Sequence, residues 1–249
     1  MSVALAPGVE WLNECYDHGD GRHEHVGVYL LGGGDRWVMV DTGSFYHREA
    51  VVEGVREATG GDGVDAVVLS HSDYPHSANV SPVREAYGEV ELVASSGAPA
   101  AQGLRDARKA DIGGSLDVCG RRLAFVDPPL ADRSHTTWIF DRADGVLFTA
   151  DGFGAYHDPG DCARTAADYP GGVPAAAVRE YHADALPWLR YVDPDAIRAV
   201  LGDIFDRFDV SWVAPAHGPP IPASVLDAHV ERVVEAAADV AAAYEVPEE

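Results

Sequence analysis

Three short apolar runs in this sequence each lead directly to residues that can bind a metal ion. The runs and the residues after them are 65–70 with His71, Asp73 and His76, 145–149 with Asp151, and 211–214 with His217. Loops at the carboxyl ends of strands are held rigidly and can converge on one point, so we expect these side chains to meet at a sheet edge. Imidazole and carboxylate donors without sulfur suit iron, zinc or manganese. The pattern therefore predicts a site for one or two metal ions, which Asp151 can bridge.

Taken singly, these residues indicate little. A histidine at a strand end is more often a hydrogen-bonded structural residue than a ligand, and an aspartate in a loop is usually a turn or a helix cap. Their joint order is more specific: His-x-Asp-x-x-His, then Phe-Thr-Ala-Asp, then Ala-Pro-Ala-His-Gly-Pro. This combination favours a metal centre over separate structural roles.

Strands and helices alternate along the hydrophobic pattern. The expected strands are residues 28–31, 36–40, 65–70, 89–94, 120–126, 136–141, 145–149 and 211–214. The expected helices are residues 47–59, 81–88, two within 179–208 that break near Asp193, and a last one from about Ser224. Residues 154–178 are rich in Gly, Pro, Ala and Asp without a period, which predicts an irregular excursion over the site. We expect a single α/β domain over residues 1–249.

Charge and length exclude several classes of function. The net charge of -23 opposes binding to nucleic acid or to an anionic membrane. No stretch approaches the roughly 20 apolar residues of a spanning helix, and the first residues lack the basic and apolar regions of a signal peptide. We therefore expect a cytoplasmic protein that acts on a small molecule.

The cysteines indicate no sulfur chemistry. Cys15, Cys119 and Cys162 are far apart in the sequence and form no Cys-x-x-Cys pair. Neither a disulfide framework nor a sulfur-rich zinc site is indicated by that spacing. We expect three structural or incidental thiols.

With these motifs in view, the chain resembles the metallo-β-lactamase superfamily, and within it the diiron domain of flavodiiron proteins and their stand-alone oxygen-binding relatives. The segments that carry the resemblance are VDTG, LSHSDYPHS, LFTADGFGAYH, YHADALPWLRYVDPDAIRAVLGDI and WVAPAHGPPI. It implies a four-layer αββα sandwich and a homodimer. Within residues 1–249 we expect one metallo-β-lactamase-like domain and no flavodoxin domain. The metal ligands that the resemblance implies are His71, Asp73, His76, Asp151 and His217.

Two departures from the family's pattern affect the ligands. The family motif is His-x-Glu-x-Asp-His, whereas this chain has Asp73 and Pro75 at the two acidic positions. The family's next histidine falls near residues 130–132, where Asp132 is the candidate replacement and His135 competes with it. With Asp132, one ion would have His71, Asp73, Asp132 and Asp151, and the other only His76, His217 and Asp151. The second set also matches the two-histidine, one-carboxylate site of mononuclear iron enzymes.

The resemblance implies an oxidoreductase or oxygen-binding protein that activates or reduces O2 or NO with one or two iron ions. Electrons would then come from a separate donor protein or from the small-molecule substrate. Tyr181 and His25 are candidates to donate hydrogen bonds to a bound oxygen species or substrate. His25 as an exposed loop residue fits the sequence equally well.

Two other functions fit the same residues. A zinc-dependent hydrolase would use metal-bound water to attack an ester, thioester, lactone or phosphodiester. Pro75 disfavours it, because most hydrolases of the superfamily have an aspartate there. A non-enzymatic sensor or binding protein with a degenerate metal site is the second alternative.

Overall fold

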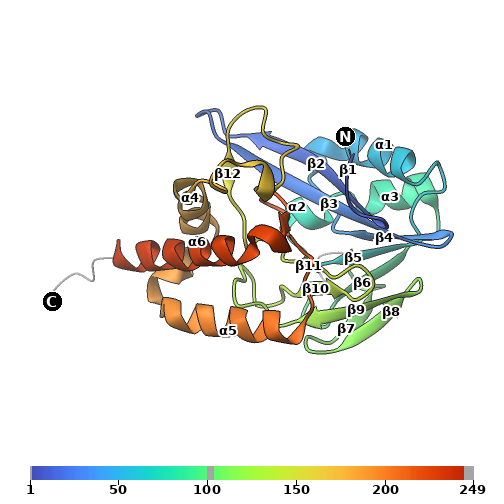
Figure 1. The fold of residues 1–249 in the computed structure, drawn as a ribbon. Coiled ribbons are helices and arrows are strands. Elements are labelled where there is room, and N and C mark those ends of the chain that lie inside the picture. Colours follow the sequence, from blue (N-terminus) through green and yellow to red (C-terminus); the bar gives the residue numbers. More distant parts are fainter. Residues whose placement is uncertain (1, 100–103, 244–249) are drawn as a thin grey trace.

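The computed structural model describes residues 2–99 and 104–243. They form two β-sheets that pack face to face between helices (Figure 1). The first sheet contains, in spatial order, β1 (Ser2–Ala6), β2 (Val9–Asp17), β3 (His23–Gly33), β4 (Arg36–Val40), β5 (Ala66–Leu69), β6 (Glu91–Ser95) and β7 (Arg108–Ala110), with β12 (Tyr156–His157) paired to β3. The second contains β14 (Ile221–Pro222), β13 (Trp212–Ala214), β11 (Val146–Phe148), β10 (Trp138–Asp141), β9 (Arg121–Val126) and β8 (Ser115–Val118).

Helices cover the outer face of each sheet. The α-helices are α1 (Arg48–Ala58), α2 (Tyr74–Ser77), α3 (Val80–Tyr87), α4 (Ala175–Ala185), α5 (Pro194–Arg207) and α6 (Ala223–Ala242). The short 3₁₀ helices are η1 (Phe45–His47), η3 (Ala166–Asp168) and η4 (Pro187–Tyr191). Helices α1 and α3 pack on the first sheet, and α4, α5 and α6 pack on the second.

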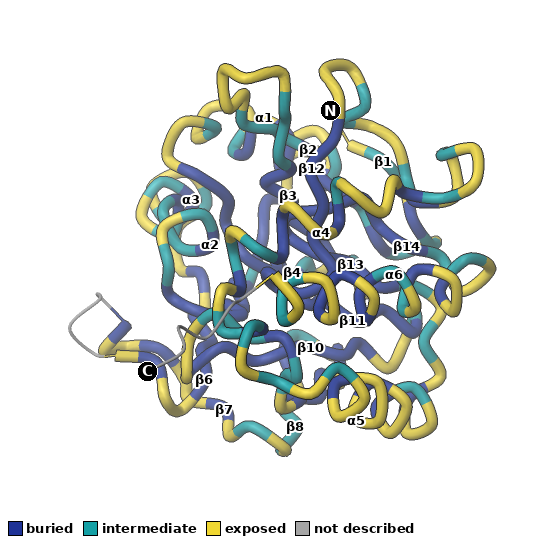
Figure 2. Tube along the Cα trace, turned by 90° about the vertical axis from the view of Figure 1, so that its left-hand side faces the viewer, coloured by how far each residue is buried: buried dark blue, intermediate teal, exposed yellow. Residues whose placement is uncertain are grey.

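Alternating side chains produce the layers. In β10, Ile139 packs between the two sheets, whereas Trp138 and Phe140 pack on the side of α4, α5 and α6. In β4, Val38 packs between the sheets and Met39 packs toward α1 and α3. Strands buried on both faces give this pattern, and Figure 2 shows that buried positions follow the sheets while exposed positions lie on the outer helices. The predicted four-layer αββα sandwich is confirmed.

Two parallel strand pairs place their carboxyl ends at one edge of the sandwich. β4 pairs with β5 in the first sheet, and β11 pairs with β13 in the second. The backbone N–H of Asp41 donates to Val68 at 3.0 Å, and that of Thr149 donates to Ala214 at 3.2 Å. The pairing thus continues to the points where the chain leaves each strand, so the loops that follow start from fixed positions.

Most expected elements are present near their predicted positions. The strands expected at 28–31 and 36–40 are β3 and β4, the helix expected at 47–59 is α1, and the last helix begins at Ala223 as α6. Strands β1, β2, β7, β8, β12 and β14 were not among the expected elements. Residues 154–178 are largely irregular, apart from β12, η3 and the start of α4. Within the described residues, no helix has both the length and the apolar character needed to cross a membrane.

Candidate metal centre

Four of the expected ligands meet at this edge. His71 follows β5, His76 lies on α2, Asp151 follows β11 and His217 follows β13. All four side chains are buried. Asp151 lies at the middle of the group, because its two carboxylate oxygens face different histidines.

Oδ1 of Asp151 faces two imidazoles. It lies 3.3 Å from Nε2 of His76 and 3.2 Å from Nε2 of His217. The two Nε2 atoms are 3.3 Å apart. Such spacing suits neighbouring donors around one metal ion that binds each at about 2.1 Å. We call these three donors the His76 half of the centre.

Oδ2 of Asp151 faces a second set of donors. It lies 3.4 Å from Nε2 of His71, which is 3.7 Å from Oδ2 of Asp132. His71, Asp73 and Asp132 can place ligand atoms within 4.8 Å of one another. We call these residues, with this oxygen of Asp151, the His71 half. Arg133 lies beside it, 2.7 Å from Asp73 and 3.6 Å from Asp132.

Asp132, and not His135, faces the centre. The hydroxyl of Thr136 donates to Oδ1 of Asp132 at 2.9 Å, which leaves Oδ2 on the side of His71. Nε2 of His135 instead lies 2.9 Å from the hydroxyl of Ser72. Among the described residues, His135 belongs to none of the groups that could hold a metal ion. The geometry therefore favours Asp132 for the position that the sequence left open.

Each imidazole of the His76 half is held by a carboxylate through its other nitrogen. Nδ1 of His76 lies 2.8 Å from Oδ2 of Asp41, and Nδ1 of His217 lies 2.8 Å from Oε1 of Glu24. These contacts favour the N–H on Nδ1, so Nε2, which faces Asp151, is the nitrogen that would bind a metal ion. Metal-binding histidines commonly have such a partner, which fixes both the tautomer and the ring orientation.

Sequence reasoning missed both carboxylate partners. Asp41 has a φ of 57°, which is uncommon for a residue other than glycine, and accepts hydrogen bonds from the backbone and hydroxyl of Ser70 at 2.8 and 2.7 Å. The sequence offered a signal for Asp41, because this residue lies in the strand-end motif VDTG. Glu24 lies within β3 outside any motif, and only the fold brings it to the centre.

The shared carboxylate sets the charge states of the metal-free centre. Burial alone would lower the pKa of His76 and His217, but the carboxylates beside them raise it, to about 9 for His76 and well above the usual value for His217. Burial alone would raise the pKa of Asp151, but the surrounding histidines hold it well below its usual range. Burial lowers the pKa of His71 to about 4, and burial together with Asp151 raises that of Asp132 to about 7. At neutral pH protons occupy the His76 half, where a metal ion would replace them.

The two pocket candidates have different surroundings. The ring of Tyr181 stacks on His217, with centroids 6.1 Å apart and planes 25° apart. Gly154 permits this position, because an added Cβ there would collide with the ring. The backbone oxygen of His25 lies 2.9 Å from Nδ1 of His217 and shares the N–H of that atom with Glu24. The imidazole of His25 lies instead in a separate cluster that includes His157.

The prediction of three free thiols is wrong for two of the cysteines. Cys15 and Cys162 form a disulfide with Cα atoms 6.4 Å apart, while Cys119 is free. The two are separated by 147 positions in the sequence. Pairing of both β2 and β12 with β3 brings them together, and the spacing of cysteines in the sequence does not reveal such long-range pairing.

Comparison with known proteins identifies the class. The model of the metallo-β-lactamase superfamily matches residues 23–202, and the chain belongs to this superfamily. A curated relative, the type A flavoprotein of Rhodobacter capsulatus, is 28% identical over 244 residues, which cover 87% of this chain and 52% of the relative. The chain thus spans about half the length of that relative.

Flavodiiron proteins are among the structural neighbours. A flavo di-iron protein variant from Thermotoga maritima has a TM-score of 0.79 at 15% identity, over 95% of this chain and 61% of the other. Rubredoxin oxygen:oxidoreductase from Desulfovibrio gigas has a TM-score of 0.77 at 17% identity, over 96% and 62%. The resemblance to the flavodiiron type is confirmed, and at these identities the structural likeness shows the fold.

The donor set fits a non-haem metal centre. Every candidate ligand is an imidazole nitrogen or a carboxylate oxygen, which suits iron, manganese or zinc. Oδ2 of Asp151 is buried and has no hydrogen-bond partner among the described residues. A buried acceptor without a donor is costly, and a bound cation would satisfy it.

Proposed function

We propose that this protein is a non-haem iron oxidoreductase or oxygen-binding protein that activates or reduces O2 or NO. The observation that carries the proposal is the position of Asp151, whose two oxygens face two separate sets of donors. The fold is shared with proteins named as flavo di-iron protein and oxygen:oxidoreductase. Bound iron would supply redox electrons and open positions for O2 or NO.

Different residues of the chain would bind the iron, orient the ligands and shield the centre from water. His76, His217 and Asp151 supply the two nitrogens and one carboxylate that a mononuclear iron site needs, and the His71 half would hold a second ion. Asp41 and Glu24 orient the two imidazoles through Nδ1. Tyr181, stacked on His217, would exclude water from this side of the centre.

For the partners, we propose O2, NO or a small organic substrate, and a separate electron-donor protein unless the substrate supplies the electrons. We also propose a homodimer and a cytoplasmic location. The net charge of -23 supports the small-molecule assignment, because it opposes binding to nucleic acid and to anionic membranes.

Metal analysis and oxygen uptake together test this function. We expect protein reconstituted anaerobically with Fe²⁺ to retain one or two irons per chain after desalting and to change its near-ultraviolet absorption when O2 is added. His76→Ala should lose both properties, while His47→Ala, at a half-buried histidine of η1 outside the centre, should keep them. Purification with zinc and hydrolysis of an ester, thioester, lactone or phosphodiester by the zinc form would instead establish the hydrolase. A folded protein that retains no metal would support the binding-protein alternative.

A further inference from the structure

A second group of side chains that could hold a metal ion lies outside the centre described above, next to His217, which contacts the backbone of His25. It consists of Cys15, His23, His25, His157 and Cys162, which we call the cysteine–histidine cluster. Cys15 is paired with His25 across β2 and β3, and His157 with His23 across β12 and β3. Residues opposite each other in a sheet share a face, and so do residues two apart on one strand. Three adjacent strands therefore place Cys15, His23, His25 and His157 on one face, and Cys162, in the turn after β12, joins them through its bond to Cys15.

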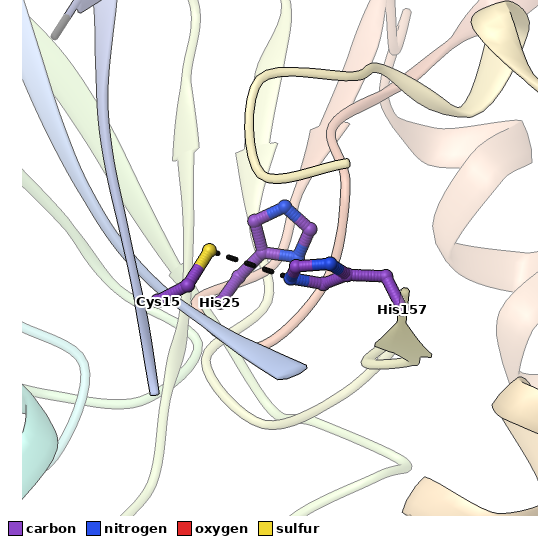
Figure 3. Close-up of side chains that lie close together, drawn as sticks. All are labelled: Cys15, His25 and His157. Atoms are coloured by element: carbon purple, nitrogen blue, oxygen red, sulfur yellow. Dashed lines mark hydrogen bonds between the residues drawn. The ribbon is translucent and has the colours of Figure 1, made fainter. Parts of the chain in front are cut away.

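The side chains lie close enough to share an ion. Sγ of Cys15 is 3.3 Å from Nε2 of His157, and the imidazoles of His25 and His157 lie side by side with centroids 4.1 Å apart (Figure 3). Ligand atoms of these three residues lie within 4.8 Å of one another, as do those of His23, His157 and Cys162. His157 belongs to both groups, and the two cysteines are bonded to each other.

Hydrogen bonds leave one lone pair free on each of two imidazoles. Nδ1 of His157 donates to the backbone oxygen of Asp158 at 2.9 Å, so its Nε2 is the acceptor nitrogen and faces Cys15. Nε2 of His25 donates to the backbone oxygen of Cys162 at 3.2 Å, so Nδ1 is its acceptor nitrogen. That Nδ1 is buried and has no hydrogen-bond partner among the described residues. A fully buried imidazole without a partner at this nitrogen points to a missing ligand.

From this arrangement we propose that the cysteine–histidine cluster, once its cysteines are reduced, binds one zinc ion. The ligands are the thiolates of Cys15 and Cys162, Nε2 of His157 and Nδ1 of His25. Two cysteines and two histidines are a common closed tetrahedral zinc set. Thiolate donors also separate this site from the sulfur-free metal centre, because sulfur favours zinc over oxygen-seeking cations.

The disulfide and the zinc site are two states of the same sulfur atoms. A dithiol or phosphine reductant supplies two electrons, the S–S bond breaks, and two protons complete the thiols while the reductant is oxidised. Zinc then displaces those two protons and holds both thiolates. A cavity of about 280 Å³ lined by His157, Tyr156 and Asp161 reaches the edge of the cluster and offers an entry path.

Cobalt as a substitute for zinc tests the site in the intact chain, because only thiolate ligands give a sulfur-to-cobalt charge-transfer band. We expect reduced, metal-free protein to take up Co²⁺ with such a band, zinc to abolish it, and the oxidised protein to lack it. The band should be lost in the Cys15→Ser/Cys162→Ser double variant and retained in Cys119→Ser, the matched control for the third thiol. His25→Ala should weaken cobalt binding more than His23→Ala. The reverse order would overturn the assignment of His25.

Alkylation of the cysteines in the wild-type protein tests the same proposal if the double variant fails to fold. In reduced wild-type protein, zinc should protect Cys15 and Cys162 from iodoacetamide and leave Cys119 as reactive as before, as measured by peptide mass spectrometry. A reduced protein that is folded by circular dichroism, shows no charge-transfer band and gains no protection from zinc would overturn the proposal.

Discussion

The two halves of the metal centre share Asp151 but differ in how their other ligands are held. In the His76 half, His76 and His217 are buried to 1% and 4% exposure, and each contacts a carboxylate through Nδ1. In the His71 half, Asp73 and Asp132 are 25% and 13% exposed, and the Arg133 guanidinium lies beside both. In the His76 half each histidine has a carboxylate partner on Nδ1, whereas in the His71 half the guanidinium of Arg133 competes with a metal ion for the carboxylates.

This difference suggests a strong site next to a weak one. Ligands oriented by hydrogen-bonded partners lose little freedom on binding, so the His76 half is prepared for an ion before the ion arrives. In the His71 half an incoming cation competes with Arg133 for Asp73. We therefore expect two classes of metal binding in one chain, with the tight class at the His76 half.

The largest effect should come from His217→Ala. Loss of a direct ligand should lower the metal affinity of the tight class by more than about 100-fold, because loss of a residue that only hydrogen-bonds a ligand already costs 10–100-fold. Asp73→Ala is the matched control and should leave the tight class unchanged while it weakens the other. Titration of metal-free protein against a chromophoric chelator measures both classes. If Asp73→Ala removes the tight class and His217→Ala does not, the ranking of the halves is reversed.

The pH dependence should separate the halves next. The pKa of His76 is raised to about 9, so below that pH a metal ion must displace its proton. The metal affinity of the His76 half should therefore rise about tenfold per pH unit for each proton displaced, up to pH 9. The pKa of His71 is lowered to about 4, so His71 is already neutral, and only Asp132, with a pKa of about 7, should contribute there. The affinity of the His71 half should therefore stop rising near pH 7. Equal slopes for both classes between pH 7 and 9 would contradict this difference. The same chelator titration, repeated across pH, measures both.

The sequence predicted the ligands better than their surroundings, for a physical reason. Apolar runs such as residues 65–70 predict strands, and the strand ends then place His71 and Asp151 without further information. The partner contacts of Asp41 and Glu24 depend on distances between segments, which no local pattern encodes. Strand β2 was missed because Glu10 and Glu14 interrupt its apolar pattern. Without this strand, the proximity of Cys15 to Cys162 could not be predicted.

A smaller effect should decide between Asp132 and His135. Asp132→Ala should weaken the second class of binding by at least about tenfold, because this carboxylate faces His71, while its loss leaves the His76 half intact. His135→Ala should leave both classes unchanged, since its imidazole contacts the hydroxyl of Ser72. Iron stoichiometry at limiting concentration reads out the difference. A comparable loss from His135→Ala would move the assignment to that histidine.

The smallest effect should come from Arg133→Gln, and it has the opposite sign. The guanidinium is 54% exposed and lies 2.7 Å from Asp73, so its attraction is that of an exposed ion pair, about 0.2–1 kcal/mol. Its removal frees the carboxylate, and the affinity of the His71 half should rise by up to about fivefold while the tight class stays constant. Arg198→Gln removes the same charge from an exposed pair with Glu231 on the helical side and controls for net charge. If both variants strengthen both classes equally, long-range charge accounts for the effect. A gain confined to Arg133→Gln and to the weak class would show that Arg133 itself makes the halves unequal.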